Sequence, residues 1–138
     1  EQSKDGMDMV LCCIDKKSNK VSFAGANNPL YFISDGELKE FKGDKQPVGI
    51  SGTELKPFTP QSISVKKGDV FYIFTDGFPD QFGGELGKKF LYKRFKEVLL
   101  SIHRNSMNAQ YSELEKSFND WKAGHYQVDD VLVIGIRV

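Results

Sequence analysis

One stretch of the sequence decides the fold: Gly68-Asp69-Val70-Phe71-Tyr72-Ile73-Phe74-Thr75-Asp76-Gly77. A glycine-aspartate turn opens it, and five consecutive apolar residues follow. A strand that is apolar on both faces is typical of the middle of a covered sheet. Asp76 comes directly after this strand, and Gly77 permits a sharp backbone turn there. The stretch therefore predicts a buried central strand over residues 70–74 with a carboxylate at its end.

Short strands are expected upstream of this one. They are predicted over residues 7–14, 21–23, 30–33, 38–41 and 63–65. Asp35-Gly36 is a strong hairpin turn between the third and the fourth. Residues 42–60 contain Gly and Pro repeatedly and predict a loop. This part of the chain therefore predicts antiparallel hairpins.

Two amphipathic helices are expected downstream. Apolar residues recur at helical spacing in two sets, Leu91, Phe95, Val98, Leu99 and Ile102, then Met107, Tyr111, Leu114, Phe118 and Trp121. We expect both stripes to pack on the sheet, with Phe95 and Trp121 largely buried. The apolar run 131–136 predicts a last strand covered on both faces. The order favours an α+β fold, a layered sandwich of mostly antiparallel strands, within one domain over residues 1–138.

Composition excludes several classes of protein. Lys and Arg together number 19, as do Asp and Glu, so the chain has no basic excess for nucleic-acid binding. No apolar run reaches the roughly 18 residues of a membrane span, so no membrane contact is expected. The two cysteines, Cys12 and Cys13, are adjacent and point to opposite faces of a strand, so they do not pair with each other. Unpaired cysteines indicate a reducing compartment, and a cytoplasmic location is expected.

Carboxylates stand at the ends of the two most apolar strands. Asp76 follows strand 70–74, and Asp129-Asp130 precede the run 131–136. If these strands are antiparallel neighbours, Asp76 and Asp129 share one small space, where they repel each other unless a cation binds. Oxygen ligands suit hard ions such as Mg²⁺ or Mn²⁺. The alternative is structural, since Asp-Gly is a common turn and Asp-Asp a common exposed strand boundary.

Five stretches resemble motifs of one enzyme family, the metal-dependent type 2C (PPM) serine/threonine protein phosphatases, in their bacterial stage II sporulation protein E-like branch. These stretches are residues 68–77, 23–30, 46–50, 80–90 and 127–133; they occur in the family's order, and the match that they define spans nearly the whole chain. The resemblance implies an α-β-β-α sandwich with a dinuclear Mn²⁺ or Mg²⁺ centre. It also implies that a metal-activated water attacks phosphorus, without a covalent nucleophile from the enzyme.

The resemblance also implies roles for particular residues. Asp76 and Asp129 match metal ligands, and Asp80 matches an acidic residue that holds a further metal or its waters. Gly77 and Asp130 would help to position these ligands without binding the metal themselves. The family's first metal motif, which supplies a bridging aspartate, has no counterpart here, and Asp5-Gly6 and Asp8 fall where the family has its next strand. The chain is therefore expected to be the C-terminal part of the domain, incomplete at its N-terminus and inactive alone.

The leading functional prediction is hydrolysis of phosphoserine or phosphothreonine on a signalling protein. The resemblance implies a phosphoprotein substrate, such as an anti-sigma-factor antagonist, and N-terminal sensor domains in a longer chain. The alternative is a catalytically inactive phosphatase-like module that binds a phosphoprotein partner. An unrelated Mg²⁺-dependent phosphotransferase is disfavoured, because the sequence contains no glycine-rich nucleotide loop.

Overall fold

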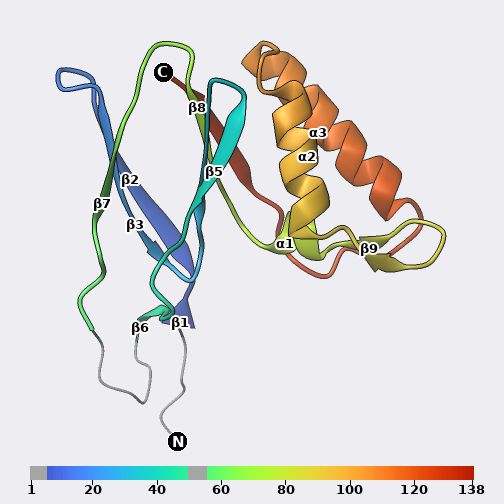
Figure 1. Ribbon diagram of the computed structural model, residues 1–138. Coiled ribbons are helices and arrows are strands. Elements are labelled where there is room, and N and C mark those ends of the chain that lie inside the picture. The colour runs from blue at the N-terminus through green and yellow to red at the C-terminus, as the bar shows by residue number, and fades with distance from the viewer. Residues whose placement is uncertain (1–5, 50–55) are drawn as a thin grey trace, which may run out of the picture.

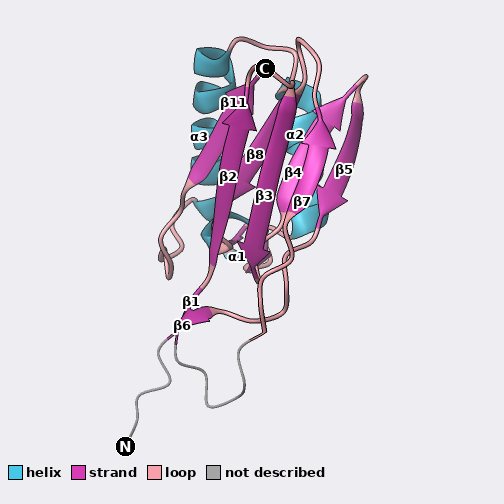
Figure 2. Cartoon of the chain, turned by 90° about the vertical axis from the view of Figure 1, so that its left-hand side faces the viewer, coloured by secondary structure: helices cyan, strands magenta, loops and turns pink. Residues whose placement is uncertain are grey.

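The computed structural model describes residues 6–49 and 56–138, which form two packed antiparallel sheets with helices on one side (Figures 1 and 2). One sheet has the order β11-β8-β4-β5. Its strands are β4 (Leu30–Ser34), β5 (Glu37–Phe41), β8 (Val70–Phe74) and β11 (Val133–Arg137). The other sheet has the order β2-β3-β7. Its strands are β2 (Met9–Asp15), β3 (Lys20–Ala26) and β7 (Gln61–Ser64).

Helices cover only the outer face of the four-stranded sheet. They are α1 (Gly77–Asp80), α2 (Tyr92–Ile102) and α3 (Met107–Lys122). Two short strand pairs complete the described structure, β1 (Gly6–Met7) with β6 (Val48–Gly49) and β9 (Phe82–Gly83) with β10 (Lys88–Lys89). The α+β sandwich of antiparallel strands is confirmed. Of its four expected layers, the described residues form three, because none of their helices lies over the β2-β3-β7 sheet.

The predicted hairpins are present. β4 and β5 pair antiparallel across Asp35 and Gly36, whose φ angles are 54° and 80°. Positive φ at both central residues is the geometry of a type I′ turn, whose twist matches that of paired strands. β2 and β3 likewise pair through a turn in which Asn19 has a φ of 52°.

The prediction for strand 70–74 is confirmed, because β8 pairs with both β4 and β11 in the middle of its sheet. Its residues alternate between two cores. Tyr72 and Phe74 pack with Tyr31 and Phe95 under the helices, whereas Phe71 packs between the two sheets. Burial of each such side chain stabilises the fold by about 1.5–3 kcal/mol.

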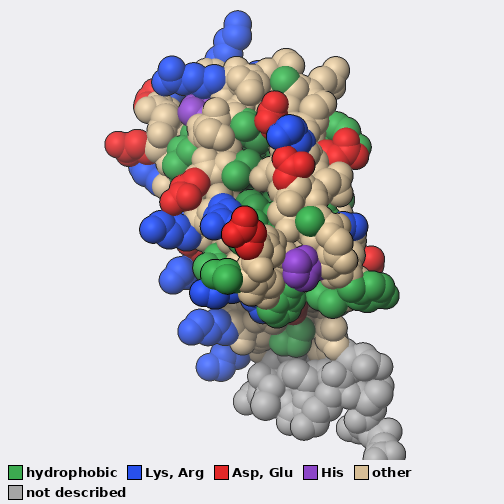
Figure 3. Space-filling model, turned by 90° about the vertical axis from the view of Figure 1, so that its right-hand side faces the viewer, with side chains coloured by type: hydrophobic (Ala, Val, Ile, Leu, Met, Phe, Trp, Pro, Cys, Tyr) green, Lys and Arg blue, Asp and Glu red, His purple; other side chains and the backbone are tan. Residues whose placement is uncertain are grey.

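The helices pack on the sheet as expected, with three exceptions among the residues of their apolar stripes. Phe95 is fully buried, and Ser106 caps α3 by accepting a hydrogen bond from the Ala109 amide. Leu91 is 57% exposed, because it precedes the first residue of α2, and Tyr111 is 66% exposed. Trp121, which was expected to be largely buried, is only half-buried. The outer surface on this side mixes charged side chains of both signs with hydrophobic ones (Figure 3).

The prediction that the last strand is covered on both faces is wrong. β11 is the edge strand of its sheet and begins only at Val133. Leu132 and Ile134 are 52% and 40% exposed. An apolar run shows which residues favour burial, but the pairing order decides which strand lies at the edge.

Two further findings concern the rest of the described chain. Cys12 is half-buried and Cys13 exposed, and both are free thiols. None of the helices in residues 6–49 and 56–138 has the length and apolar character needed to cross a membrane.

Candidate functional site

The ends of β8 and β11 meet at one edge of the sheet. The two strands are antiparallel and Phe74 pairs with Val133, so the residues after β8 lie beside those before β11. Thr75 joins the two segments. Its hydroxyl donates to the Asp130 carbonyl at 2.9 Å and accepts from the Leu132 amide at 3.0 Å. These bonds fix the spacing between the segments that carry Asp76 and Asp129.

Gly77 is required at this edge by a close backbone approach. A Cβ atom at position 77 would overlap the carbonyl group of Asp130. The chain then turns into α1, and the Asp80 amide donates to the Asp76 carbonyl at 2.9 Å. One helical turn therefore carries both Asp76 and Asp80.

The carboxylates of the site interact electrostatically. Partial desolvation raises the pKa of Asp76, and the charges of Asp129 and Asp80 raise it further. Crowded carboxylates disfavour each other's ionised form. The charges of Asp129 and Asp80 therefore reach Asp76 in the folded chain.

Two residues beside the cluster were not assigned to it from the sequence. Asp8, set aside as part of a strand, also raises the pKa of Asp76, and its Oδ1 accepts from the Asn27 side chain at 2.7 Å. Tyr92, the first residue of α2, has a raised pKa because of desolvation and then the charges of Asp80 and Asp76. Only the folded arrangement brings these side chains to the site, and no motif in the sequence marks them.

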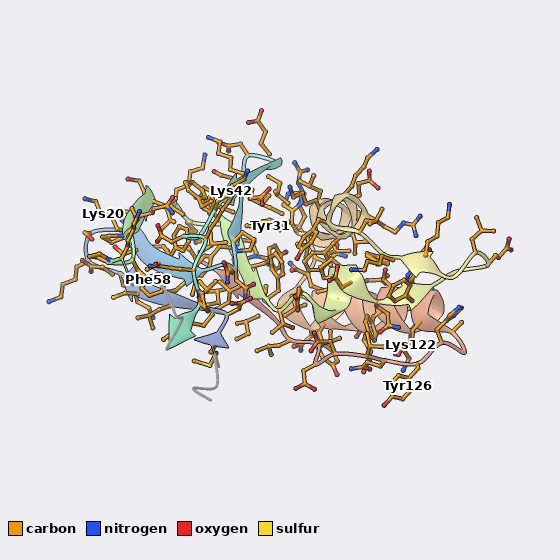
Figure 4. All side chains as sticks on the ribbon, turned by 90° about the horizontal axis from the view of Figure 1, so that it is seen from below. Lys20, Tyr31, Lys42, Phe58, Lys122 and Tyr126 are labelled. Atoms are coloured by element: carbon orange, nitrogen blue, oxygen red, sulfur yellow. The ribbon has the colours of Figure 1, made fainter. Side chains whose placement is uncertain are left out.

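A hydrogen bond from Gln81 fixes the start of the segment that leads to β11. Gln81 is buried and its side-chain amide donates to the Tyr126 carbonyl at 3.0 Å. The Tyr126 side chain itself points away from the protein (Figure 4). Nearer the cluster, Asp129 Oδ1 accepts from the Asp130 amide at 2.7 Å. These contacts hold Asp129 in place without engaging both of its oxygens.

Asp80 has a competing partner. Its Oδ2 lies 3.2 Å from Lys89 Nζ on β10, and both side chains are partly exposed. An exposed ion pair of this kind contributes at most about 1 kcal/mol. A cation that binds Asp80 can therefore displace the lysine at low cost.

The donor set is oxygen-only, which suits a hard divalent cation, and a cation between Asp76 and Asp129 would relieve their repulsion. Throughout residues 6–49 and 56–138, however, no three Asp, Glu, His or Cys side chains converge into a ready-made ion cage. The described carboxylates thus fit part of a metal centre.

Comparisons with known proteins bear on this geometry. The family described as stage II sporulation protein E (SpoIIE) matches residues 2–138. Among solved structures, the SiaA-PP2C domain of Pseudomonas aeruginosa is 31% identical, with a TM-score of 0.85 over 95% of this chain and 51% of that chain. No relative was found among curated protein sequences.

Two more distant structures share the fold. The phosphatase domain of SpoIIE from Bacillus subtilis, presoaked with Mn, is 15% identical, with a TM-score of 0.71 over 95% of this chain and 56% of that one. RsbX in complex with magnesium is 17% identical, with a TM-score of 0.57 over 94% of this chain and 55% of that one. The present chain therefore spans about half the length of each of these three structures.

Proposed function

The chain belongs to the stage II sporulation protein E (SpoIIE) family, and on that premise we propose that it is part of a protein phosphatase that hydrolyses phosphoserine and phosphothreonine with Mn²⁺ or Mg²⁺. The observation that carries the proposal is the pairing of β8 with β11, which brings the turn that carries Asp76 and Asp80 beside the segment that carries Asp129. The solved SpoIIE domain presoaked with Mn and RsbX with magnesium support a divalent ion.

In this proposal the chain's own carboxylates hold the metal. Asp76 and Asp129 ligate it directly, and Asp80 releases Lys89 to bind a further ion or its waters. Thr75, Gly77 and Asp130 keep the two ligand-bearing segments at a fixed separation. When bound, a dinuclear centre supplies an activated water and neutralises charge on the phosphoryl oxygens.

We further propose that the intact centre needs ligands from outside these residues. The described part of the chain offers no complete ion cage, and the matched structures are about twice as long. The 138-residue chain would then be inactive alone, whereas the longer protein would be active. The substrate would be a phosphoprotein such as an anti-sigma-factor antagonist, and the domain would act in the cytoplasm as the output of N-terminal sensor domains.

One alternative has a specific observation in its favour. An inactive phosphatase-like module that binds a phosphoprotein would also lack a complete ion cage in its described residues. The three grouped aspartates favour the enzyme, because a module without catalysis has no need to hold mutually repelling carboxylates together.

The test is phosphate release from a phosphoserine peptide by the full-length protein. Activity should require Mn²⁺ or Mg²⁺ and disappear in excess chelator. Asp76→Asn should lower it by more than the roughly 10–100-fold that loss of a group supporting a metal ligand typically costs. Asp120→Asn serves as the control, because Asp120 lies on the exposed face of α3 and pairs with Lys116. Peptide binding without turnover under any metal condition would favour the inactive module.

A further inference from the structure

A polar pocket lies at the opposite end of the sheets from Asp76. Its volume is about 520 Å³, and its lining includes Asp35, Lys66, Lys67, His103, Arg104 and Arg137. These residues come from the β4–β5 turn, the β7–β8 turn, the α2–α3 turn and the end of β11. Figure 1 shows all four at the upper end of the molecule, whereas α1 lies at the lower end.

The pocket is locally positive in a chain of zero net charge. Four cationic side chains line it against two carboxylates, and both carboxylates are already engaged. Asp35 binds Lys66 Nζ through both of its oxygens, at 2.7 and 2.6 Å. Asp69 is 3% exposed and accepts from the Lys66 backbone amide at 2.9 Å. Asp35 offsets the charge of Lys66 and Asp69 offsets one further cation, so four cations against two carboxylates leave the pocket with an excess of positive charge.

Several of these cationic side chains have N–H donors that no protein group in the described residues engages. Arg137 Nη2 donates to the carbonyls of His103 and Asn105, each at 2.6 Å, which fixes its guanidinium at the α2–α3 turn and leaves its other N–H groups available. In the part of the chain that the structure describes, Lys67 and Arg104 form no ion pair and no side-chain hydrogen bond. On this side Figure 3 shows a histidine among Lys and Arg side chains at the upper end.

We propose that this pocket binds a phosphate group, free or as a monoester. Arginine presents paired N–H donors that match the oxygens of phosphate, and several cations around one space favour a dianion over a single carboxylate. The pocket volume lies within the range of small-molecule sites, roughly 300–1,000 Å³, which leaves room for the organic part of an ester. The site is separate from the candidate metal centre and does not depend on its activity.

The test measures binding to the full-length protein by calorimetry in excess chelator. Without metal, the Asp76 cluster is anionic and repels phosphate, so it does not contribute. Inorganic phosphate and O-phospho-L-serine are titrated at constant ionic strength, with L-serine as the ligand control. Both phosphates should bind saturably. Lys67→Ala and Arg104→Ala should each weaken binding about tenfold, the usual scale for a lost charged hydrogen bond, and the double variant should abolish it.

Lys88→Ala is the matched control, since it removes one exposed positive charge from β10, at the end of the molecule that carries the Asp76 cluster. The affinity of Lys88→Ala for both phosphate ligands should equal that of the wild type. Because Lys67 and Arg104 are exposed, the variants should keep the wild-type melting temperature. Tighter binding of phosphoserine than of inorganic phosphate would identify a monoester site, and equal binding a site for the phosphate alone. The proposal is overturned if neither phosphate binds saturably, if L-serine binds as well, or if the folded double variant keeps its affinity.

Discussion

The backbone carbonyl of Asp130 lies so close to Gly77 that no side chain fits between them. This contact packs the first residue of α1 against the segment that precedes β11. The acidic residues of the candidate site occupy the adjacent positions on both segments, Asp76 and Asp129. The spacing of the carboxylates therefore depends on the absence of a single methyl group.

Gly77→Ala should push the two segments apart. We expect a loss of about 1–3 kcal/mol in the free energy of unfolding, as for other overpacked positions, and a loss of metal-dependent activity. Chemical denaturation and phosphate release measure the two effects. Gly124→Ala is the control, because a Cβ atom there would meet nothing within 4 Å. Wild-type stability and activity in Gly77→Ala would show that the close approach has no importance.

Thr75→Val tests the hydroxyl that bridges the same segments. The substitution keeps the shape of the side chain but leaves the Asp130 carbonyl and the Leu132 amide without this partner. The expected cost is about 1–3 kcal/mol in the free energy of unfolding. Ser112→Ala, which removes one hydrogen bond to a carbonyl within α3, should change stability by less than about 0.5 kcal/mol. An equal effect of the two substitutions would contradict the bridging role.

Because the pKa of Asp76 is raised, we expect the free energy of unfolding of the metal-free protein to fall as the pH rises. The folded state binds the proton more tightly than the unfolded state, so the stability contributed by Asp76 is full below its usual pKa of 3.8 and is lost as pH rises through the raised value. Asp76→Asn abolishes this loss. The Asp76 side chain makes no capping hydrogen bond to α1, so the substitution removes no helix cap.

In chelator at neutral pH, Asp76→Asn should therefore be more stable than the wild type in urea denaturation. The difference should shrink as the pH falls toward 4. With saturating Mn²⁺ the order should reverse, because only the wild type gains from metal binding. A variant that is less stable than the wild type in chelator would refute the electrostatic account of the site.

Much of the fold could be predicted from local patterns. The β8 strand is apolar on both faces and lies in the middle of its sheet, and the Asp35-Gly36 turn has the two positive φ angles that its residues favour. The edge position of β11 could not be predicted, because its apolar run resembles that of a central strand. Edge and centre differ only in pairing, which is a long-range property.

The candidate site could be predicted in part, because two of its residues follow or precede apolar strands. Asp76 and Asp129 stand at the ends of neighbouring antiparallel strands, so the sequence could place them together once the pairing was assumed. Asp8 acts on Asp76 from the position just before β2, where it is bonded to Asn27, and Tyr92 lies near the aspartates at the start of α2. Such contacts between layers leave no periodic signal in the sequence.

The isolated 138-residue chain should hydrolyse phosphopeptide far more slowly than the full-length protein, even with saturating Mn²⁺. Its described residues offer three aspartates at the site but no complete cage, and Mg²⁺ or Mn²⁺ needs about six oxygen ligands. Leu132 and Ile134 at the exposed edge should also promote self-association. Sedimentation and a phosphate-release assay on this chain measure both effects. Turnover equal to that of the full-length protein would mean that these residues alone supply the ligands.

Mn²⁺ binding to the full-length protein, followed by electron paramagnetic resonance, tests the central claim most directly. If Asp76 and Asp129 ligate the metal, Asp129→Asn should weaken Mn²⁺ affinity by at least about tenfold, since an anionic ligand is lost. Asp120→Asn should bind Mn²⁺ as the wild type does. Equal affinity in all three proteins would contradict the assignment of the metal centre to this edge of the sheet.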